Sequence, residues 1–223
     1  MSTRRDLLVH GAALLALGCT PTPNLADTHD DTDAGNADDT DDTGHTGETG
    51  ETGDTGELPD ECLVTEPMGE GPYFRANAPE RTDLRTLGEE GVVLRLAGRV
   101  RSALDCRALQ GATVEIWHAQ MDGIYDMQSA TMHYRCTLTT DDKGRFAITT
   151  FHPPSYGEDT DPIQSHLHVW VKHPDHEDIV TQLRFAGDPN DDGMAPAELL
   201  LAVETNEDGS EDMSFVFAMA PAV

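Results

Sequence analysis

Apolar and polar residues alternate in short runs after residue 62, and turn residues separate one run from the next. Alternation with a period of two is typical of strands that bury one face, whereas a surface helix would show a period near 3.6. Little of this region has the helical period. The pattern predicts strands over residues 92–100, 113–118, 134–140, 145–151, 166–172, 180–185 and 213–218.

Strands at this spacing predict an all-β fold, a β-sandwich of about 7–9 mostly antiparallel strands with long loops. At most one short helix is expected, near residues 195–203. The segments 134–140 and 145–151 flank the turn Asp141-Asp142-Lys143-Gly144, which predicts that they form a hairpin.

The first 19 residues have the pattern of an export signal. Arg4 and Arg5 precede a short apolar run that is too short to span a bilayer and ends at Cys19. Residues 15–19 resemble a bacterial lipobox, which predicts that Cys19 is acylated, although Ala16 stands where leucine is usual. A plain cleaved signal peptide is the alternative. Either reading predicts an exported protein of the bacterial cell envelope.

Residues 20–60 contain almost no large apolar side chains and repeat Asp/Glu-Thr-Gly units. Such a segment cannot bury a core, so we expect a disordered acidic linker. Repeated carboxylates also suggest calcium binding, but a self-repelling tether is the better interpretation. The folded domain is then expected to cover residues 61–223.

The chain of 223 residues has a formal net charge of -28, and residues 61–223 still carry 28 acids against 12 bases. This surface repels phosphate backbones and anionic lipid headgroups. We therefore expect no nucleic-acid partner, and membrane attachment only through the N-terminal lipid.

If Cys19 is acylated, three cysteines remain in an oxidising compartment. Cys136 lies in a predicted buried strand, whereas Cys62 and Cys106 lie in turn-like surroundings. These surroundings favour a Cys62–Cys106 disulfide, although spacing alone does not choose the pair.

Four residues are candidates for a metal site. His166 and His168 lie two apart on a predicted strand, so both imidazoles point to the same face. Tyr125 and Tyr156 each follow a predicted strand, in a chain with only four tyrosines. Phenolates are hard, anionic ligands, and two of them with two imidazoles select Fe(III) over softer or less charged ions.

An ordered set of motifs resembles the intradiol ring-cleavage dioxygenases, the catechol and protocatechuate enzymes, over roughly residues 62–220. The motifs are Gly71-Pro72-Tyr73-Phe74, Gly111 to Ala119, Asp122-Gly123-Ile124-Tyr125, Thr140 to Phe146, Tyr156, His166-Leu167-His168 and Thr181-Gln182-Leu183-Arg184-Phe185.

This resemblance implies one Fe(III) per domain, bound by Tyr125, Tyr156, His166 and His168. It implies that O2 cleaves a catechol-type ring between its hydroxyl-bearing carbons, giving a muconate-type diacid. Tyr156, as the ligand that substrate displaces, and Gln182, as a donor, would be catalytic. Tyr73, Arg75 and Ile163 would lie at the substrate pocket, and a homodimer is left open.

The sequence departs from the family at one position. An arginine usually stands three residues before the first histidine ligand, and here that residue is Ile163. Loss of such a cation typically costs about 10²–10³ in rate. Arg75 or Arg135 are candidate replacements, and Tyr134 competes with Tyr125 as a ligand. The alternative function is a non-catalytic tethered β-sandwich that binds iron or a catecholic ligand.

Overall fold

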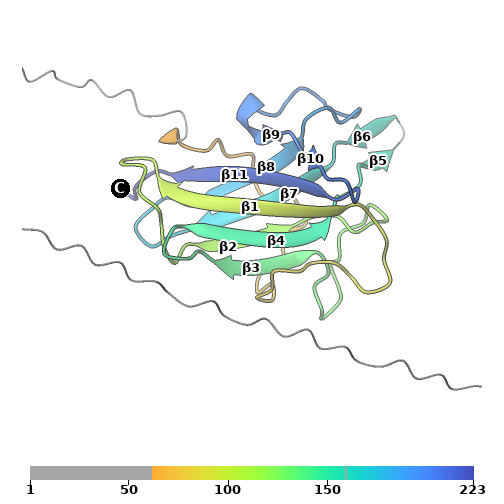
Figure 1. Cartoon of the computed structure of the whole chain (residues 1–223), viewed down its shortest axis with the longest axis horizontal. Helices are drawn as coiled ribbons and strands as arrows, with labels where there is room; N and C mark the ends of the chain where they lie inside the picture. Colours follow the sequence, from red (N-terminus) through yellow and green to blue (C-terminus); the bar gives the residue numbers. More distant parts are fainter. Residues whose placement is uncertain (1–61, 159) are drawn as a thin grey trace, which may run out of the picture. The chain divides into compact units, whose positions relative to one another are not determined.

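The computed structural model describes residues 62–158 and 160–223, so the predicted export signal and linker lie outside the described residues. The described part is a β-sandwich, as the sequence predicts (Figure 1). No helix in these residues is long and apolar enough to cross a membrane.

One layer is a four-stranded sheet in the order β10-β11-β1-β4. Its strands are β1 (Val93–Ser102), β4 (Arg145–Phe151), β10 (Glu204–Thr205) and β11 (Glu211–Met219). β1 and β11 run parallel, and the other pairs in this sheet are antiparallel.

The second layer is a five-stranded sheet in the order β3-β2-β7-β8-β9. Its strands are β2 (Thr113–Trp117), β3 (Arg135–Thr139), β7 (His166–Lys172), β8 (Ile179–Phe185) and β9 (Leu200–Leu201). A separate ribbon joins β5 (Tyr156–Glu158) to β6 (Asp161–Ile163). The expected helix is a single 3-10 turn, Ala197–Leu199.

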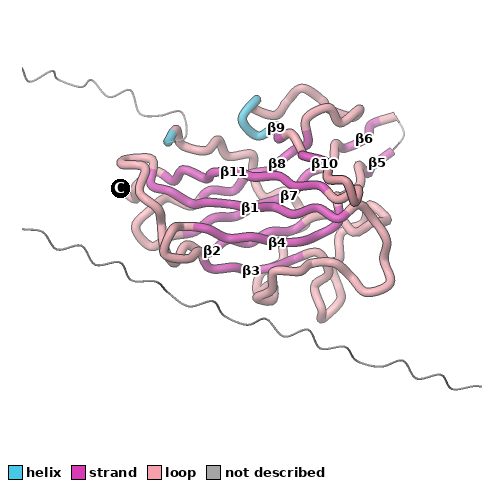
Figure 2. The backbone as a smooth tube through the Cα atoms, in the orientation of Figure 1, coloured by secondary structure: helices cyan, strands magenta, loops and turns pink. Residues whose placement is uncertain are grey.

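The seven longer strands are those that the alternating pattern predicts. The structure adds four strands of two or three residues, β5, β6, β9 and β10, among the described residues. A segment of two or three residues is too short to display a period of two, so the sequence did not reveal these four strands. Long loops connect the strands, as expected (Figure 2).

The predicted hairpin of residues 134–140 and 145–151 is wrong. β3 pairs with β2 and β4 pairs with β1, so the turn at 141–144 crosses from one sheet to the other. The Val100 amide donates to the Gly144 carbonyl at 2.8 Å, which holds this turn beside β1. Cys136 and Ile148 therefore bury their side chains in one core from opposite sheets.

The inner faces of the two sheets enclose the main core. On β7 the residues that face this core are Leu167, Val169 and Val171, all fully buried. Alternation along the strand sends His166 and His168 to the outer face of the five-stranded sheet. The sheet therefore buries apolar side chains on one side and presents two imidazoles on the other.

A disulfide joins Cys62 to Cys106, with 5.4 Å between their Cα atoms. It ties the start of the described domain to the loop between β1 and β2. Cys136 is unpaired and buried in the core. Burial raises the pKa of its thiol to about 12, so this cysteine is unreactive at neutral pH.

Candidate metal centre

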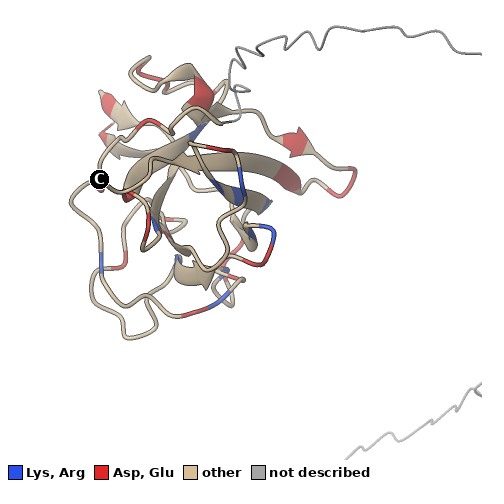
Figure 3. Ribbon diagram, turned by 90° about the vertical axis from the view of Figure 1, so that its left-hand side faces the viewer, with Lys and Arg blue, Asp and Glu red and all other residues tan. Residues whose placement is uncertain are grey.

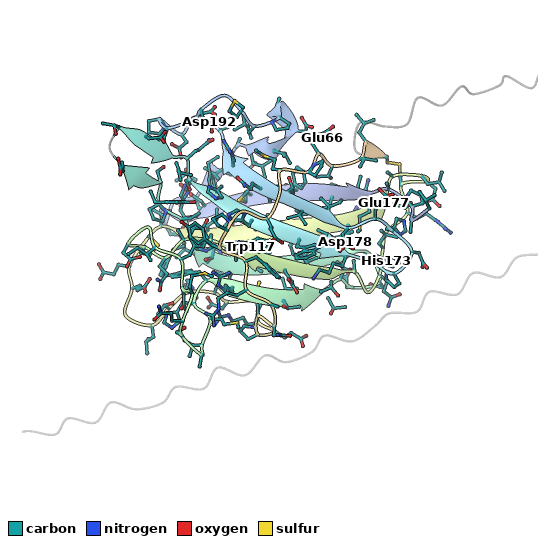
Figure 4. All side chains as sticks on the ribbon, turned by 180° about the vertical axis from the view of Figure 1, so that it is seen from behind. Glu66, Trp117, His173, Glu177, Asp178 and Asp192 are labelled. Atoms are coloured by element: carbon teal, nitrogen blue, oxygen red, sulfur yellow. A yellow bond between two sulfur atoms is a disulfide. The ribbon has the colours of Figure 1, made fainter. Side chains whose placement is uncertain are left out.

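The candidate site lies on the outer face of the five-stranded sheet, beneath a second and smaller apolar cluster. Trp117, Ala119 and Tyr125 form the centre of this cluster, and half-buried rings pack around them: Tyr73, Phe74, Tyr156 and Trp170. Figure 4 views the domain from behind, with Trp117 labelled. The cluster keeps water from a face of the sheet that would otherwise be exposed.

Three side-chain atoms converge in this cluster. The Nε2 atoms of His166 and His168 lie 3.1 Å apart, and the Tyr125 hydroxyl lies 3.2 Å from the first and 3.1 Å from the second. Three atoms at these separations can each lie about 2 Å from one common ion, the usual bonding distance for imidazole and oxygen ligands. The geometry therefore fits a metal ion.

The hydrogen bond of His166 aims the lone pair of this imidazole at the site. Its Nδ1 lies 2.7 Å from the Gln164 carbonyl, which can only accept, so Nδ1 carries the proton and Nε2 is free to bind a cation. Burial lowers the pKa of His166, which favours the neutral ring that a metal requires.

The second imidazole is held by stacking. The ring of Trp117 lies parallel to that of His168, with 4.9 Å between centroids and an interplanar angle of 1°. Gly71, at a φ of +66°, also packs close to this ring, since a Cβ there would lie 3.2 Å from its Cε1 atom. Nδ1 of His168 is buried without a hydrogen-bond partner among the described residues.

A tight loop after β2 presents Tyr125. The Asp126 carboxylate accepts hydrogen bonds from the backbone amides of Gln128, Ser129 and His133. Burial disfavours ionisation of Asp126, but hydrogen bonds from Ser129, His133 and Gln128 outweigh it and lower its pKa. The ionised carboxylate therefore holds this loop in place.

Tyr156 completes the set of predicted ligands. Its ring lies 5.6 Å from that of Tyr125 and 5.8 Å from that of His166, measured between centroids. Gly123, at a φ of +79°, permits this approach, because a Cβ there would come within 2.9 Å of the Tyr156 Cβ. Tyr156 is half-buried, whereas Tyr125 is only 5% exposed.

The two phenols need a cation to ionise here. Burial raises the pKa of Tyr125 far above its ordinary value, and Tyr156 raises it further through its charge and a hydrogen bond. Burial also raises the pKa of Tyr156. A highly charged metal ion would offset these costs, and phenolate with neutral imidazole is a donor set that suits Fe(III).

The other predicted site residues have different surroundings. Tyr73 stacks on Tyr125, with 4.4 Å between ring centroids. Gln182 lies on β8 directly opposite His168, and Ile163 lies on β6 opposite Tyr156 with 43% of its surface exposed. Arg75 donates to the carbonyls of Asp126 and Ser129, so this arginine holds the Tyr125 loop.

Tyr134, the competing phenolate, lies elsewhere. Its side chain is fully buried in the main core, and its hydroxyl donates to the Glu89 carboxylate. It does not take part in the triangle of Tyr125, His166 and His168. Alternation alone could not separate the two tyrosines, because neither lies in a regular strand.

Sequence reasoning missed Arg184 and the role of Trp117. Arg184 lies on β8 directly opposite His166 and is almost fully buried. Arg184 stands two positions after Gln182 on the same strand, and alternate residues of a strand share a face. This spacing could have placed Arg184 at the site from the sequence. Trp117 on β2 also contacts the site, because its ring stacks on that of His168.

No group of three or more His, Cys, Asp or Glu side chains that could hold a metal occurs within residues 62–158 and 160–223. The candidate centre has only two such side chains, and its remaining donors are phenols.

Comparisons with known proteins agree on one family. A family model described as "Dioxygenase" matches residues 69–219. A catechol 1,2-dioxygenase of Pseudomonas sp. (strain EST1001) is 29% identical over 141 residues, 54% of this chain and 46% of the relative. A 6-chlorohydroxyquinol 1,2-dioxygenase of Cupriavidus pinatubonensis is also 29% identical, over 75% of this chain and 68% of the relative.

Among solved structures, the dioxygenase domain of a dioxygenase and carbohydrate-binding protein fusion from Streptomyces sp. SirexAA-E is 30% identical, with a TM-score of 0.63. The alignment covers 71% of this chain and 99% of that domain. By contrast, the chain spans about half the length of the first curated relatives that it matches.

Proposed function

The chain belongs to the intradiol ring-cleavage dioxygenase family, and we propose that it cleaves a catechol-type ring between its two hydroxyl-bearing carbons with O2. The proposed cofactor is one Fe(III), held by Tyr125, Tyr156, His166 and His168. The observation that carries the proposal is the convergence of the Tyr125 hydroxyl with both histidine Nε2 atoms at 3.1–3.2 Å. Relatives named for catechol, chlorocatechol and hydroxyquinol support an aromatic diol as substrate.

Each ligand residue has a distinct part in this proposal. When bound, Fe(III) supplies a Lewis acid that orients the diol and oxygen. Tyr125 is buried and clamped by its loop, so it stays in place through the reaction. Tyr156 is half-buried, and we assign it as the phenol that leaves when substrate arrives. Its oxygen, once free of the metal, would be the base that takes a proton from a substrate hydroxyl.

The remaining residues orient the substrate and exclude water. The ring cluster around Tyr73 and Phe74 closes the apolar side of the site. Gln182 faces the same side of the sheet as His168, where its amide can donate to developing negative charge. The ring cluster excludes water from the site, and a hydrogen bond from the Gln182 amide to a negative charge is stronger there than in water.

The charge of the domain bears on the choice of diol. Acidic residues outnumber basic ones and are spread over the loops and strand ends (Figure 3). A cavity of about 300 Å³ beside Tyr156 is lined by Glu158 together with Ser155, Gly157, Pro162 and Asn190. A carboxylate next to the entrance repels a second carboxylate, so we propose uncharged catechols rather than acids such as protocatechuate.

The test is spectroscopic and then kinetic. Protein produced with added iron should be red-brown, because phenolate-to-Fe(III) charge transfer absorbs visible light. Anaerobic addition of catechol should shift this band, and admission of air should consume one O2 per ring cleaved. A colourless, iron-free product would contradict the metal centre. A coloured protein that consumes no O2 with any catechol tested would favour the non-catalytic binding module.

We also propose that the protein is exported and anchored through acylated Cys19. The basic start, the short apolar run and the position of Cys19 support this, although these residues lie outside the described part. Mass spectrometry of the mature N-terminus tests it. An acylated cysteine as first residue is expected, and an unmodified N-terminus elsewhere would contradict the anchor.

A further inference from the structure

Arg184 is an almost fully buried cation beside the candidate metal centre. The antiparallel register of β7 and β8 places it directly opposite His166. Residues opposite each other in this way share a face, with Cβ atoms about 4.5–5.5 Å apart. Its side chain is only 11% exposed. A buried guanidinium is costly unless its charge is used.

Two contacts, both made by Nη1, fix the orientation of this guanidinium, and its Nε is buried without a partner among the described residues. Nη1 donates to the side-chain oxygen of Gln164 at 3.2 Å and to Asp192 at 2.8 Å. Gln164 is the residue whose carbonyl orients His166. Nε of Arg184 is buried and has no hydrogen-bond partner among the described residues. The arrangement therefore presents an unsatisfied, charged donor near the ligands.

Arg184 is bonded to a loop that borders the cavity beside Tyr156. Its partner Asp192 and the cavity residue Asn190 belong to the same loop, and that cavity is also lined by the half-buried Tyr156. This is the side from which a ligand can enter.

Arg135 is a second buried arginine near the ligands, and its Nη1 also lacks a hydrogen-bond partner among the described residues. Its Nε donates to the Asp126 carbonyl and its Nη2 to the sulfur of Met127, both in the loop after Tyr125. Only 1% of the residue is exposed. Arg135 therefore supports the loop from behind, and Arg184 is the cation that an incoming ligand can meet.

We propose that Arg184 binds the negative charge of the catecholate and is the cation that position 163 lacks. This inference rests on the proposed function, because it needs an anionic diol at the metal centre. Arg184 would then contact the substrate oxygen or the electron-rich ring through its free Nε. The positive charge that recognises the catecholate therefore lies on β8, not in the segment before β7.

The experiment measures ligand binding apart from turnover. Iron-loaded protein is titrated anaerobically with 4-nitrocatechol, and the shift of the visible band gives the dissociation constant. Arg184→Gln should keep its iron content and its colour, but bind 4-nitrocatechol about 10- to 100-fold more weakly, because a charged hydrogen bond is lost. Arg184→Lys keeps the charge and should lose less than about tenfold.

A matched control removes one positive charge from an exposed arginine far from the ligands in sequence. The side chain of Arg107 is 84% exposed, so Arg107→Gln changes the net charge equally without touching the site. Its affinity for 4-nitrocatechol should equal that of the wild type. An equal loss in Arg107→Gln and Arg184→Gln would overturn the proposal, because the effect would then come from net charge.

Asp192→Asn provides a test that does not depend on removing the arginine. It takes away the carboxylate that offsets the Arg184 charge, so affinity for 4-nitrocatechol should rise by about two- to fivefold. If Arg184→Gln does not fold, Asp192→Asn decides the question. Unchanged or weaker binding of 4-nitrocatechol by this variant would overturn the proposal.

The outcomes separate this proposal from the function on which it rests. Wild-type affinity in an iron-loaded Arg184→Gln protein overturns the role of Arg184 alone. Loss of iron and colour in Arg184→Gln also overturns it, since the arginine would then serve the metal rather than the ligand. Absence of any 4-nitrocatechol shift in the coloured wild-type protein overturns both.

Discussion

The Trp117 ring lies parallel to the His168 ring at a centroid distance of 4.9 Å, and this stack joins β2 to β7 on the outer face of the five-stranded sheet. Stacking restricts the rotation of an imidazole whose Nδ1 has no hydrogen-bond partner in the described residues. His168 thus depends on a ring contact for the orientation that His166 obtains from the Gln164 carbonyl.

Trp117→Leu should therefore weaken iron binding. Second-layer contacts of this kind typically contribute about 10- to 100-fold to metal affinity. The variant should also lose about 1–3 kcal/mol of unfolding free energy through poorer packing. Competition with a chelator measures the affinity. Trp117→Phe, which keeps a ring against His168, is the control, and equal affinities in the two variants would refute the stacking role.

Tyr125 and Tyr134 should respond in opposite ways to loss of their hydroxyl groups. Tyr125→Phe removes one corner of the ligand triangle and should abolish the visible charge-transfer band. Tyr134→Phe loses only the hydrogen bond to Glu89, so the band should persist at a cost of about 1 kcal/mol in stability. Visible spectra of the two iron-supplemented proteins decide the matter. A band that survives in Tyr125→Phe and vanishes in Tyr134→Phe would reverse the assignment.

The Cys62–Cys106 disulfide closes a loop over a sequence separation of 44 residues. Restricting the unfolded chain in this way should contribute about 4 kcal/mol to the free energy of unfolding. Thermal melts with and without reductant check this: the wild type should lose stability when reduced. The Cys62→Ser/Cys106→Ser double variant should match the reduced wild type and should not respond to reductant. A response in that variant would point to Cys136.

His118 should make the iron-free protein sensitive to acid. Its Nε2 lies 2.7 Å from the Thr150 hydroxyl and its Nδ1 lies 2.7 Å from the Ala119 carbonyl. Burial lowers its pKa to about 3, well below the ordinary value of about 6.5 for an unfolded chain. Between these values the unfolded state binds more protons, so stability falls as the pH falls below about 6.5.

The expected slope rises to about 1.4 kcal/mol per pH unit well below pH 6.5, which gives about 2.3 kcal/mol between pH 6.5 and pH 4.5. Urea denaturation of chelator-treated protein at several pH values measures it. His118→Gln has no titrating group at this position, so its stability should depend less steeply on pH by that amount. Parallel pH profiles for the two proteins would show that the pKa of His118 does not differ between the folded and unfolded states.

The alternating pattern was enough to place the seven longer strands and to put the two histidines on one face. Alternation along 166–172 requires that His166 and His168 share one face while Leu167 points to the other, and the structure agrees. This works because the period of a strand is a local property of the backbone. The motifs that follow one another from Gly71 to Phe185 also identified the family, since their order survives divergence in the surrounding residues.

Tertiary structure alone decided which strands and side chains meet. Alternation does not say which strand is the neighbour, so the turn at 141–144 was taken for a hairpin although it crosses between sheets. For the same reason, a missing cation at Ile163 could not be matched with Arg184, which lies on another strand and reaches the site only through the register of β8 with β7. Contacts between residues distant in sequence depend on sheet order, which no local pattern encodes.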